Sequence, residues 1–163
     1  MKKLWMMLAL CLILAGCGSA ETFETLGQVQ HESEELAAMG TVQLTLPESA
    51  SKEVFANNGD TMYDCGDYTL TVQTLSGGDF SRTVQTLCGF SVNKLTVMES
   101  GTGKTSRYEW VWTAAGEGGD VLCRAAVLDD GNYHYCLCVI APAQNAGALQ
   151  EEWTELFQSF HLT

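Results

Sequence analysis

The chain has 163 residues, of which 8 are basic and 20 acidic, so its formal net charge is −12 at neutral pH. This acidity argues against a nucleic-acid-binding protein, which needs a basic face to neutralise phosphates. Anionic lipid headgroups would also repel the chain, so any attachment to a membrane must use something other than surface charge. The length gives room for one domain and a short additional segment.

The N-terminus has the three parts of a secretory signal peptide: two lysines, an apolar run over residues 4–14, and small residues before Cys17. The run is too short for a membrane-spanning helix. Leu14-Ala15-Gly16-Cys17 resembles the lipobox of bacterial lipoproteins, in which the cysteine takes a diacylglyceryl group and becomes the first mature residue. The resemblance implies a signal peptide over 1–16 and anchoring by acyl chains such as palmitate on the extracytoplasmic face of the cell membrane.

Residues 17–40 are predicted to form an acidic tether. They contain no lysine or arginine, and removal of the two signal-peptide lysines would bring the net charge of the chain to −14. Like charges extend such a segment. Ser33–Met39 could form one or two helical turns that stop at Gly40. The acidic side chains of the tether are Glu21, Glu24, Glu32, Glu34 and Glu35.

The predicted domain, residues 41–163, opens with strands. Apolar residues alternate with polar ones over 42–46, which predicts a half-buried strand that ends at Pro47. Residues 61–65 and 68–75 have the composition of a hairpin around the turn Gly66-Asp67.

A short helix is predicted next, over residues 80–88. Its apolar residues fall at helical spacing, with Asp79 as the N-cap and Gly89 as the stop. The apolar positions are Phe80, Val84, Leu87 and Cys88.

The second half of the domain is predicted to be antiparallel strands joined by glycine-rich turns. Asp129-Asp130-Gly131-Asn132 is a strong hairpin signal, and Pro142 ends the last strand. A closing helix follows, with Asn145 as its cap and Glu151, Glu152 and Glu155 on the water side. The strands are expected over 94–99, 105–113, 121–128 and 133–140. The apolar stripe of the helix is Leu149, Trp153, Leu156, Phe157 and Phe160. The pattern predicts an α+β fold: an antiparallel sheet with a short inserted helix and a C-terminal helix packed on it.

Three features resemble the PsbP-like family, which includes extrinsic photosystem proteins and small bacterial lipoproteins. They are the opening strand that ends in Pro47, the late hairpin with Tyr133 after its turn, and the closing Leu156-Phe157-Gln158-Ser159-Phe160. The resemblance would cover residues 41–163. It implies a binding or accessory role without catalysis, and it transfers no site residue.

No cofactor or metal site emerges from the motifs. Gly101-Thr102-Gly103-Lys104-Thr105 suggests a phosphate-binding loop, but Met98 stands where the first glycine is needed, and a strand follows instead of a helix. We therefore expect a hairpin turn and no nucleotide. The loop at 129–132 is too short for calcium. His31, His134 and His161 share no ligand spacing, and no serine stands in a nucleophile elbow.

Five cysteines remain in the domain: Cys65, Cys88, Cys123, Cys136 and Cys138. With the turn centred on Asp130-Gly131, Cys123 and Cys138 would lie opposite each other, which leaves a disulfide open. This would be a hydrogen-bonded pair, where we expect a bridge to be strained, so we predict free, mainly buried thiols.

The sequence favours a lipid-anchored, non-catalytic binding or accessory domain that contacts an envelope protein or complex. Two alternatives stay open. One is a thiol-based redox protein that uses Cys136 and Cys138, which would need accessible thiols of lowered pKa. The other is a surface module that binds a glycan or peptide by stacking on Tyr108, Trp110 and Trp112, although a strand in a covered sheet would more often bury such a stripe.

Overall fold

The computed structural model describes residues 37–54 and 60–163, and Ala37–Thr163 forms a compact unit by itself. The predicted signal peptide, Cys17 and most of the predicted tether lie outside the described residues. So does the first part of the helix expected over Ser33–Met39, and residues 37–40 form no helix. Within the described ranges, no helix is both long and apolar enough to cross a membrane.

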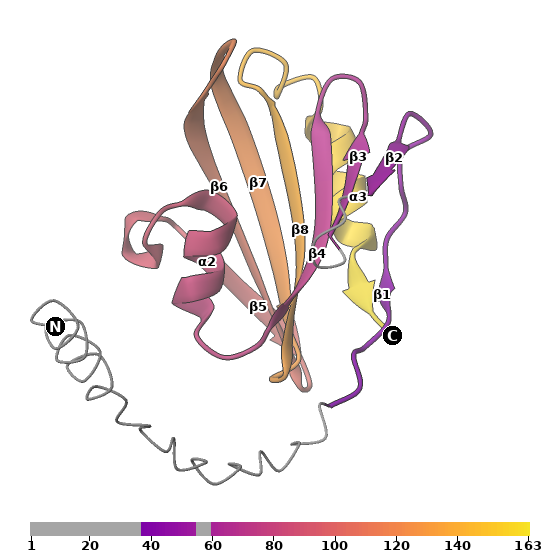
Figure 1. The fold of residues 1–163 in the computed structure, drawn as a ribbon, viewed down its shortest axis with the longest axis vertical. Helices are drawn as coiled ribbons and strands as arrows, with labels where there is room; N and C mark the ends of the chain where they lie inside the picture. Colours follow the sequence, from indigo (N-terminus) through magenta and orange to yellow (C-terminus); the bar gives the residue numbers. More distant parts are fainter. Residues whose placement is uncertain (1–36, 55–59) are drawn as a thin grey trace, which may run out of the picture. The chain divides into compact units, whose positions relative to one another are not determined.

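An antiparallel sheet of seven strands forms the centre of the domain, in the order β2-β3-β4-β8-β7-β6-β5 (Figure 1). A second sheet pairs only the short strands β1 and β9. The strands of the large sheet are β2 Ser51–Val54, β3 Thr61–Asp64, β4 Thr69–Ser76, β5 Met98–Thr102, β6 Thr105–Gly116, β7 Gly119–Asp129 and β8 Tyr133–Pro142. The remaining elements are β1 Val42–Gln43, α2 Phe80–Cys88, the 3₁₀ turn η1 Val92–Lys94, α3 Gln150–Ser159 and β9 His161–Leu162.

The two helices cover opposite faces of the large sheet (Figure 1). We call these the α2 face and the α3 face. Alternation along each strand divides the core between them: Trp110 and Cys136 belong to the α2 face, whereas Leu137 and Val139 pack under α3. The predicted α+β fold, with its antiparallel sheet and two helices, is confirmed.

Helix α2 begins and ends where the sequence predicts. The Asp79 side chain accepts a hydrogen bond from the backbone N–H of Ser81 at 2.9 Å. Gly89 adopts a left-handed conformation with φ of 76° and donates its N–H to the carbonyl of Gln85. Both caps satisfy backbone groups that a helix end leaves without a partner.

The hairpin of β7 and β8 has a different register from the predicted one. Its turn is centred on Gly131-Asn132, because the Asp130 carboxylate accepts the N–H groups of Asn132 and Tyr133 and so closes the loop one residue later. Cys123 therefore pairs with Ile140, and Cys138 with Ala125. The predicted register, which placed Cys123 opposite Cys138 and left a disulfide open, is wrong: the two are diagonal neighbours, with Cα atoms about 7–8 Å apart, beyond the usual reach of a disulfide. The described cysteines are free.

The closing helix buries its predicted stripe but starts later than expected. Residues 143–149 form successive turns, in which the Asn145 carbonyl accepts the N–H of Ala148, and the helix begins only at Gln150. Asn145 is therefore not the N-cap, and Gly147 within this run disfavours a helical start. Glu152 accepts the Tyr68 hydroxyl at 2.7 Å and does not simply face water.

Two predicted strands are shorter than expected. Residues 42–46 contribute only Val42–Gln43, because their partner β9 has two residues. The strand expected over 94–99 starts at Met98, after η1. The predicted turn after β5 is confirmed as a hairpin turn, where Gly103 has a φ of 72°.

Candidate functional site

The aromatic stripe of β6 lies in the core of the α2 face. Trp110 and Trp112 expose only 1% and 8% of their surface. The Phe80 ring of α2 stacks on half-buried Tyr108, with 4.1 Å between the ring centroids. A stacking platform for a glycan or peptide needs exposed ring faces, so this alternative does not hold for the two tryptophans.

The thiols of Cys136 and Cys138 share this buried layer. Burial raises the pKa of each to about 12. Burial also raises the pKa of Cys123 to about 11. A redox-active cysteine needs an accessible thiol of lowered pKa, and these have the opposite properties. Burial of both thiols on the α2 face therefore argues against a redox site at Cys136 and Cys138.

Thr83, His134 and Asp129 form a polar cluster that the sequence does not predict. The Thr83 hydroxyl lies 2.7 Å from Nδ1 of His134, and Nε2 of the same ring lies 3.5 Å from Oδ2 of Asp129. The hydroxyl donates to Nδ1 when Nε2 carries the ring proton towards Asp129. The succession of a hydroxyl, an imidazole and a carboxylate in contact resembles a hydrolase triad, but Thr83 and His134 are both buried. The buried Thr83–His134 contact joins α2 to the first residues of β8, so we expect the cluster to hold α2 on the sheet.

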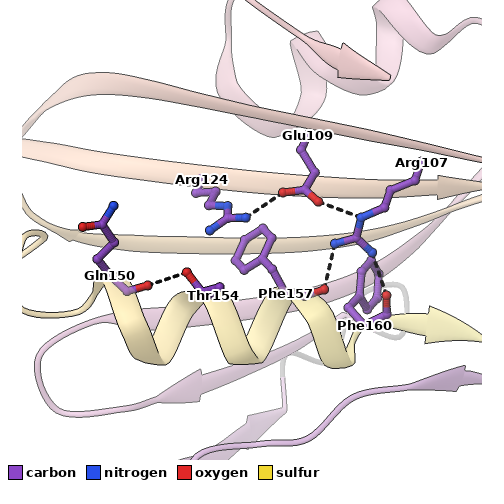
Figure 2. Close-up of polar contacts among 7 residues, drawn as sticks. All are labelled: Arg107, Glu109, Arg124, Gln150, Thr154, Phe157 and Phe160. Atoms are coloured by element: carbon purple, nitrogen blue, oxygen red, sulfur yellow. Dashed lines mark hydrogen bonds and ion pairs between the residues drawn. The ribbon is translucent and has the colours of Figure 1, made fainter. Parts of the chain in front are cut away.

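The α3 face carries an ion-pair network, which we call the Arg clamp: Arg107, Glu109 and Arg124 (Figure 2). Each arginine donates to one Glu109 oxygen at 2.7 Å. Arg107 also donates to the carbonyls of Phe157 and Phe160, each at 2.7 Å. These carbonyls lie at the C-terminal end of α3, where a helix leaves acceptors without partners and a positive charge is favourable.

The clamp determines the charge state of Glu109. Burial alone would raise the pKa of this carboxyl, but hydrogen bonds from Arg124 and Arg107 outweigh burial and hold the pKa below its usual range. The Arg124 guanidinium also lies over the Phe157 ring, 4.1 Å from its centroid. Two arginines against one carboxylate leave one positive charge on this part of the face.

A groove opens beside the clamp, between the start of α3 and strands β6 and β7, with a volume of about 460 Å³. We call it the α3 groove. Val111 exposes 50% of its surface there. Of the Arg124 donors, only Nη2 has a hydrogen-bond partner among the described residues, and the buried Nε1 of Trp153 has none there. The groove is lined by Val111, Leu122, Arg124, Ala143, Ala146, Gly147, Gln150 and Trp153.

The sequence does not predict this groove. Its walls come from β6, β7 and the α3 segment, and no motif links them. One signal was present: Arg107, Glu109 and Arg124 are charged residues inside otherwise apolar strands, where a buried charge must be paired.

The described residues offer no group of three or more His, Cys, Asp or Glu side chains placed to hold a metal ion. The Asp129 and Asp130 carboxylates that suggested calcium instead accept backbone N–H groups of their own turn. Lys104 is exposed in the β5–β6 turn, at the end of a strand pair and away from any helix start.

The fold is similar to that of solved structures. The cyanobacterial PsbP of Synechocystis sp. PCC 6803 gives a TM-score of 0.55 at 11% identity over 78% of this chain and 95% of that chain. LpqN of Mycobacterium tuberculosis, described as involved in cell envelope biogenesis, gives 0.50 at 12% identity over 78% and 87%. A Mog1 mutant gives 0.47 at 15% identity over 74% and 90%. No protein-family model and no curated protein matches the sequence. The likeness concerns the fold, which is PsbP-like.

Proposed function

We propose that this protein is a lipid-anchored, non-catalytic binding module on the extracytoplasmic face of a bacterial cell membrane. A diacylglyceryl group on Cys17 would hold it there, and the acidic segment to residue 40 would space the domain from the bilayer. The domain would contact an envelope protein or complex through the α3 groove.

The observation that carries this proposal is the α3 groove. It combines mainly apolar walls with one arginine whose remaining donors have no partner among the described residues, which is the composition of a recognition site. The strongest candidates for chemistry in the described residues, the Cys136 and Cys138 thiols and the Thr83–His134 pair, are all buried on the other face. Binding therefore fits the groove better than catalysis.

Two further observations support the cellular location. Leu14-Ala15-Gly16-Cys17 has the form of a lipobox, and the apolar run before it is of signal-peptide length. The similar structure of LpqN belongs to a protein involved in cell envelope biogenesis. If the anchor is correct, labelled palmitate will mark the wild-type protein in cells but not Cys17→Ala. Equal labelling of both would contradict the assignment.

Photo-crosslinking in cells tests the binding role. A benzophenone amino acid at Val111 would lie in the groove, whereas the same group at Asp67, exposed in the β3–β4 turn, serves as a matched control. We expect Val111 to give a discrete crosslinked product that Asp67 does not give. Identical products from both positions, or none from Val111, would contradict a partner in the groove.

A further inference from the structure

Strand β6 is much longer than its outer neighbour β5. It has 12 residues, and β5 has 5. β5 pairs only with Thr105–Glu109 of β6. Among the described strands, the rest of β6, Trp110–Gly116, pairs with β7 alone. Figure 1 shows β5 beside only one end of β6. The other end is therefore an edge of the sheet, which we call the β6 edge.

The register shows which backbone groups of the β6 edge point outwards. Gly116 pairs with Gly119 around a two-residue turn, so these residues bond to each other, and alternate residues back along β6 face β7. The residues between them, Val111, Thr113 and Ala115, direct their N–H and C=O groups away from β7. Counting from the β5 turn gives the same result, since Thr105, Arg107 and Glu109 bond to β5 and Val111 comes next in that series.

Within residues 37–54 and 60–163, the β6 edge lacks the usual protection against strand addition. Its pairing with β7 runs without a bulge from Ser106 to Gly116, and it contains no proline. No charged residue stands between Glu109 and Glu117. Val111, Thr113 and Ala115 are all exposed. Proteins normally block such an edge with a charge, a proline, a bulge or a covering segment.

We propose that the β6 edge binds an extended segment of a partner protein as an added antiparallel or parallel strand. This rests on the proposed function and names its mode of recognition. Up to six backbone hydrogen bonds would form with Val111, Thr113 and Ala115. Alternate side chains of the segment would lie on the α3 face, beside Val111 and the groove, so they should be apolar.

Charge favours a different protein over a second copy of this chain. Glu117 and Asp120 stand exposed at the tip where the β6 edge ends, which suits basic residues flanking the added segment. Two copies of a chain with net charge −12 would repel each other.

Amide hydrogen exchange tests whether the edge is free. The sample is residues 17–163 with Cys17→Ser, which retains the predicted tether. The amides of Val111, Thr113 and Ala115 should exchange at least a hundredfold faster than those of Trp112 and Ala114, which bond to β7. Equal protection of both sets would mean that another part of the chain covers the edge, and the proposal would be overturned.

A designed peptide tests strand addition directly. The probe is acetyl-Lys-Val-Thr-Val-Thr-Val-Lys-amide. Two controls carry N-methyl groups, one on the odd-numbered residues and the other on the even-numbered residues. Each control therefore lacks the N–H donors of one edge of the peptide. The probe should bind and shift the amide resonances of Val111, Thr113 and Ala115, whereas methylation of the edge that faces β6 should weaken binding at least tenfold. If neither methylation pattern weakens binding, or if the probe does not bind, the proposal is wrong.

Thr113→Pro supplies the matching protein variant. Its ring removes an N–H that has no partner in the described residues, so the fold should tolerate it and probe binding should fall at least tenfold. Thr113→Val keeps the N–H and should bind like the wild type. Should Thr113→Pro not fold, the methylated peptides decide alone.

Two results separate the edge from the general binding role. Sedimentation that shows wild-type dimers and Thr113→Pro monomers would identify a second copy of this chain as the occupant. It would overturn the proposal that a different protein binds the β6 edge. If the crosslink from Val111 in cells survives Thr113→Pro unchanged, the edge mode is wrong while the binding function stands.

Discussion

The two faces of the large sheet differ in the side chains that they bury and in those that they leave exposed. The α2 face collects the residues whose types suggest chemistry, such as Cys136, Cys138 and His134, and covers them with α2. The α3 face carries the Arg clamp and leaves Val111 exposed beside a groove and a strand edge that has no partner among the described strands. Cys136, Cys138 and His134 are thus buried packing residues on the α2 face, whereas the proposed recognition surface lies on the α3 face.

The difference follows from coverage. Helix α2 contributes Phe80 and Val84 to a continuous layer over the stripe of β6. Helix α3 packs with residues of β4, β7 and β8, and its last carbonyls are bound by Arg107. Val111, in the part of β6 beyond Glu109, remains half exposed on the α3 side, and among the described residues no strand pairs with this part of β6 on its outer side, because β5 ends before it.

Among the substitutions that test the two faces, Trp153→Ala should lower the free energy of unfolding most. The indole is buried under α3 and packs edge-on against Tyr68, with ring centroids 5.8 Å apart. Truncation should lower the free energy of unfolding by about 3–5 kcal/mol, measured by urea melts. Trp153→Phe, which keeps most of the apolar area, should lose much less. A loss below about 1 kcal/mol for Trp153→Ala would mean that α3 is not docked as described.

Glu109→Gln should come next. The change removes the negative centre of the Arg clamp, and the free energy of unfolding should fall by about 1.5–3 kcal/mol, the range for hydrogen bonds to charged groups. Glu99→Gln is the control, because Glu99 is exposed on β5. Equal losses for the two variants would show that the clamp does not stabilise the α3 face.

The same carboxyl predicts a dependence on pH. Because the fold lowers the pKa of Glu109, its contribution is present above the pKa of the unfolded carboxyl and is lost as the pH falls through the folded pKa. Urea melts over this acid range should give a smaller loss for Glu109→Gln than for the wild type. Parallel curves would contradict the lowered pKa.

Thr83→Val tests the polar cluster on the α2 face. The change leaves Nδ1 of buried His134 without its partner and should cost about 1–2 kcal/mol of unfolding free energy. Thr83→Ser keeps the hydroxyl and should cost less. If the valine variant is as stable as the wild type, the polar cluster does not fix α2 on the sheet.

Lys104→Ala should have the smallest effect, within about 0.5 kcal/mol, because the side chain is exposed in a turn. ATP binding by the wild type, lost in this variant, would restore the phosphate-loop interpretation.

Local signals made α2 and most strands after Tyr68 predictable, because Asp79, Gly89 and the glycine turns act on their own neighbours, whereas β5 starts four residues later than the sequence predicts. The register of β7 and β8 depended on which backbone groups Asp130 bonds, and a shift of one residue in the turn separated Cys123 from Cys138. The α3 groove and the β6 edge could not be predicted, since they depend on where β5 ends and how α3 lies across strands distant in sequence.

Native-state alkylation of thiols tests the contrast between the faces most directly. Val111→Cys would introduce a thiol on the open side of β6, to be compared by peptide mapping with Cys136 and Cys138 in the same molecule. We predict that the introduced thiol reacts within about tenfold of the rate of a small model thiol, since neither burial nor a partner hinders it. Cys136 and Cys138 should remain unmodified until denaturant unfolds the domain. Labelling of Cys136 or Cys138 in the folded protein as fast as the introduced thiol would contradict the burial of both thiols under α2.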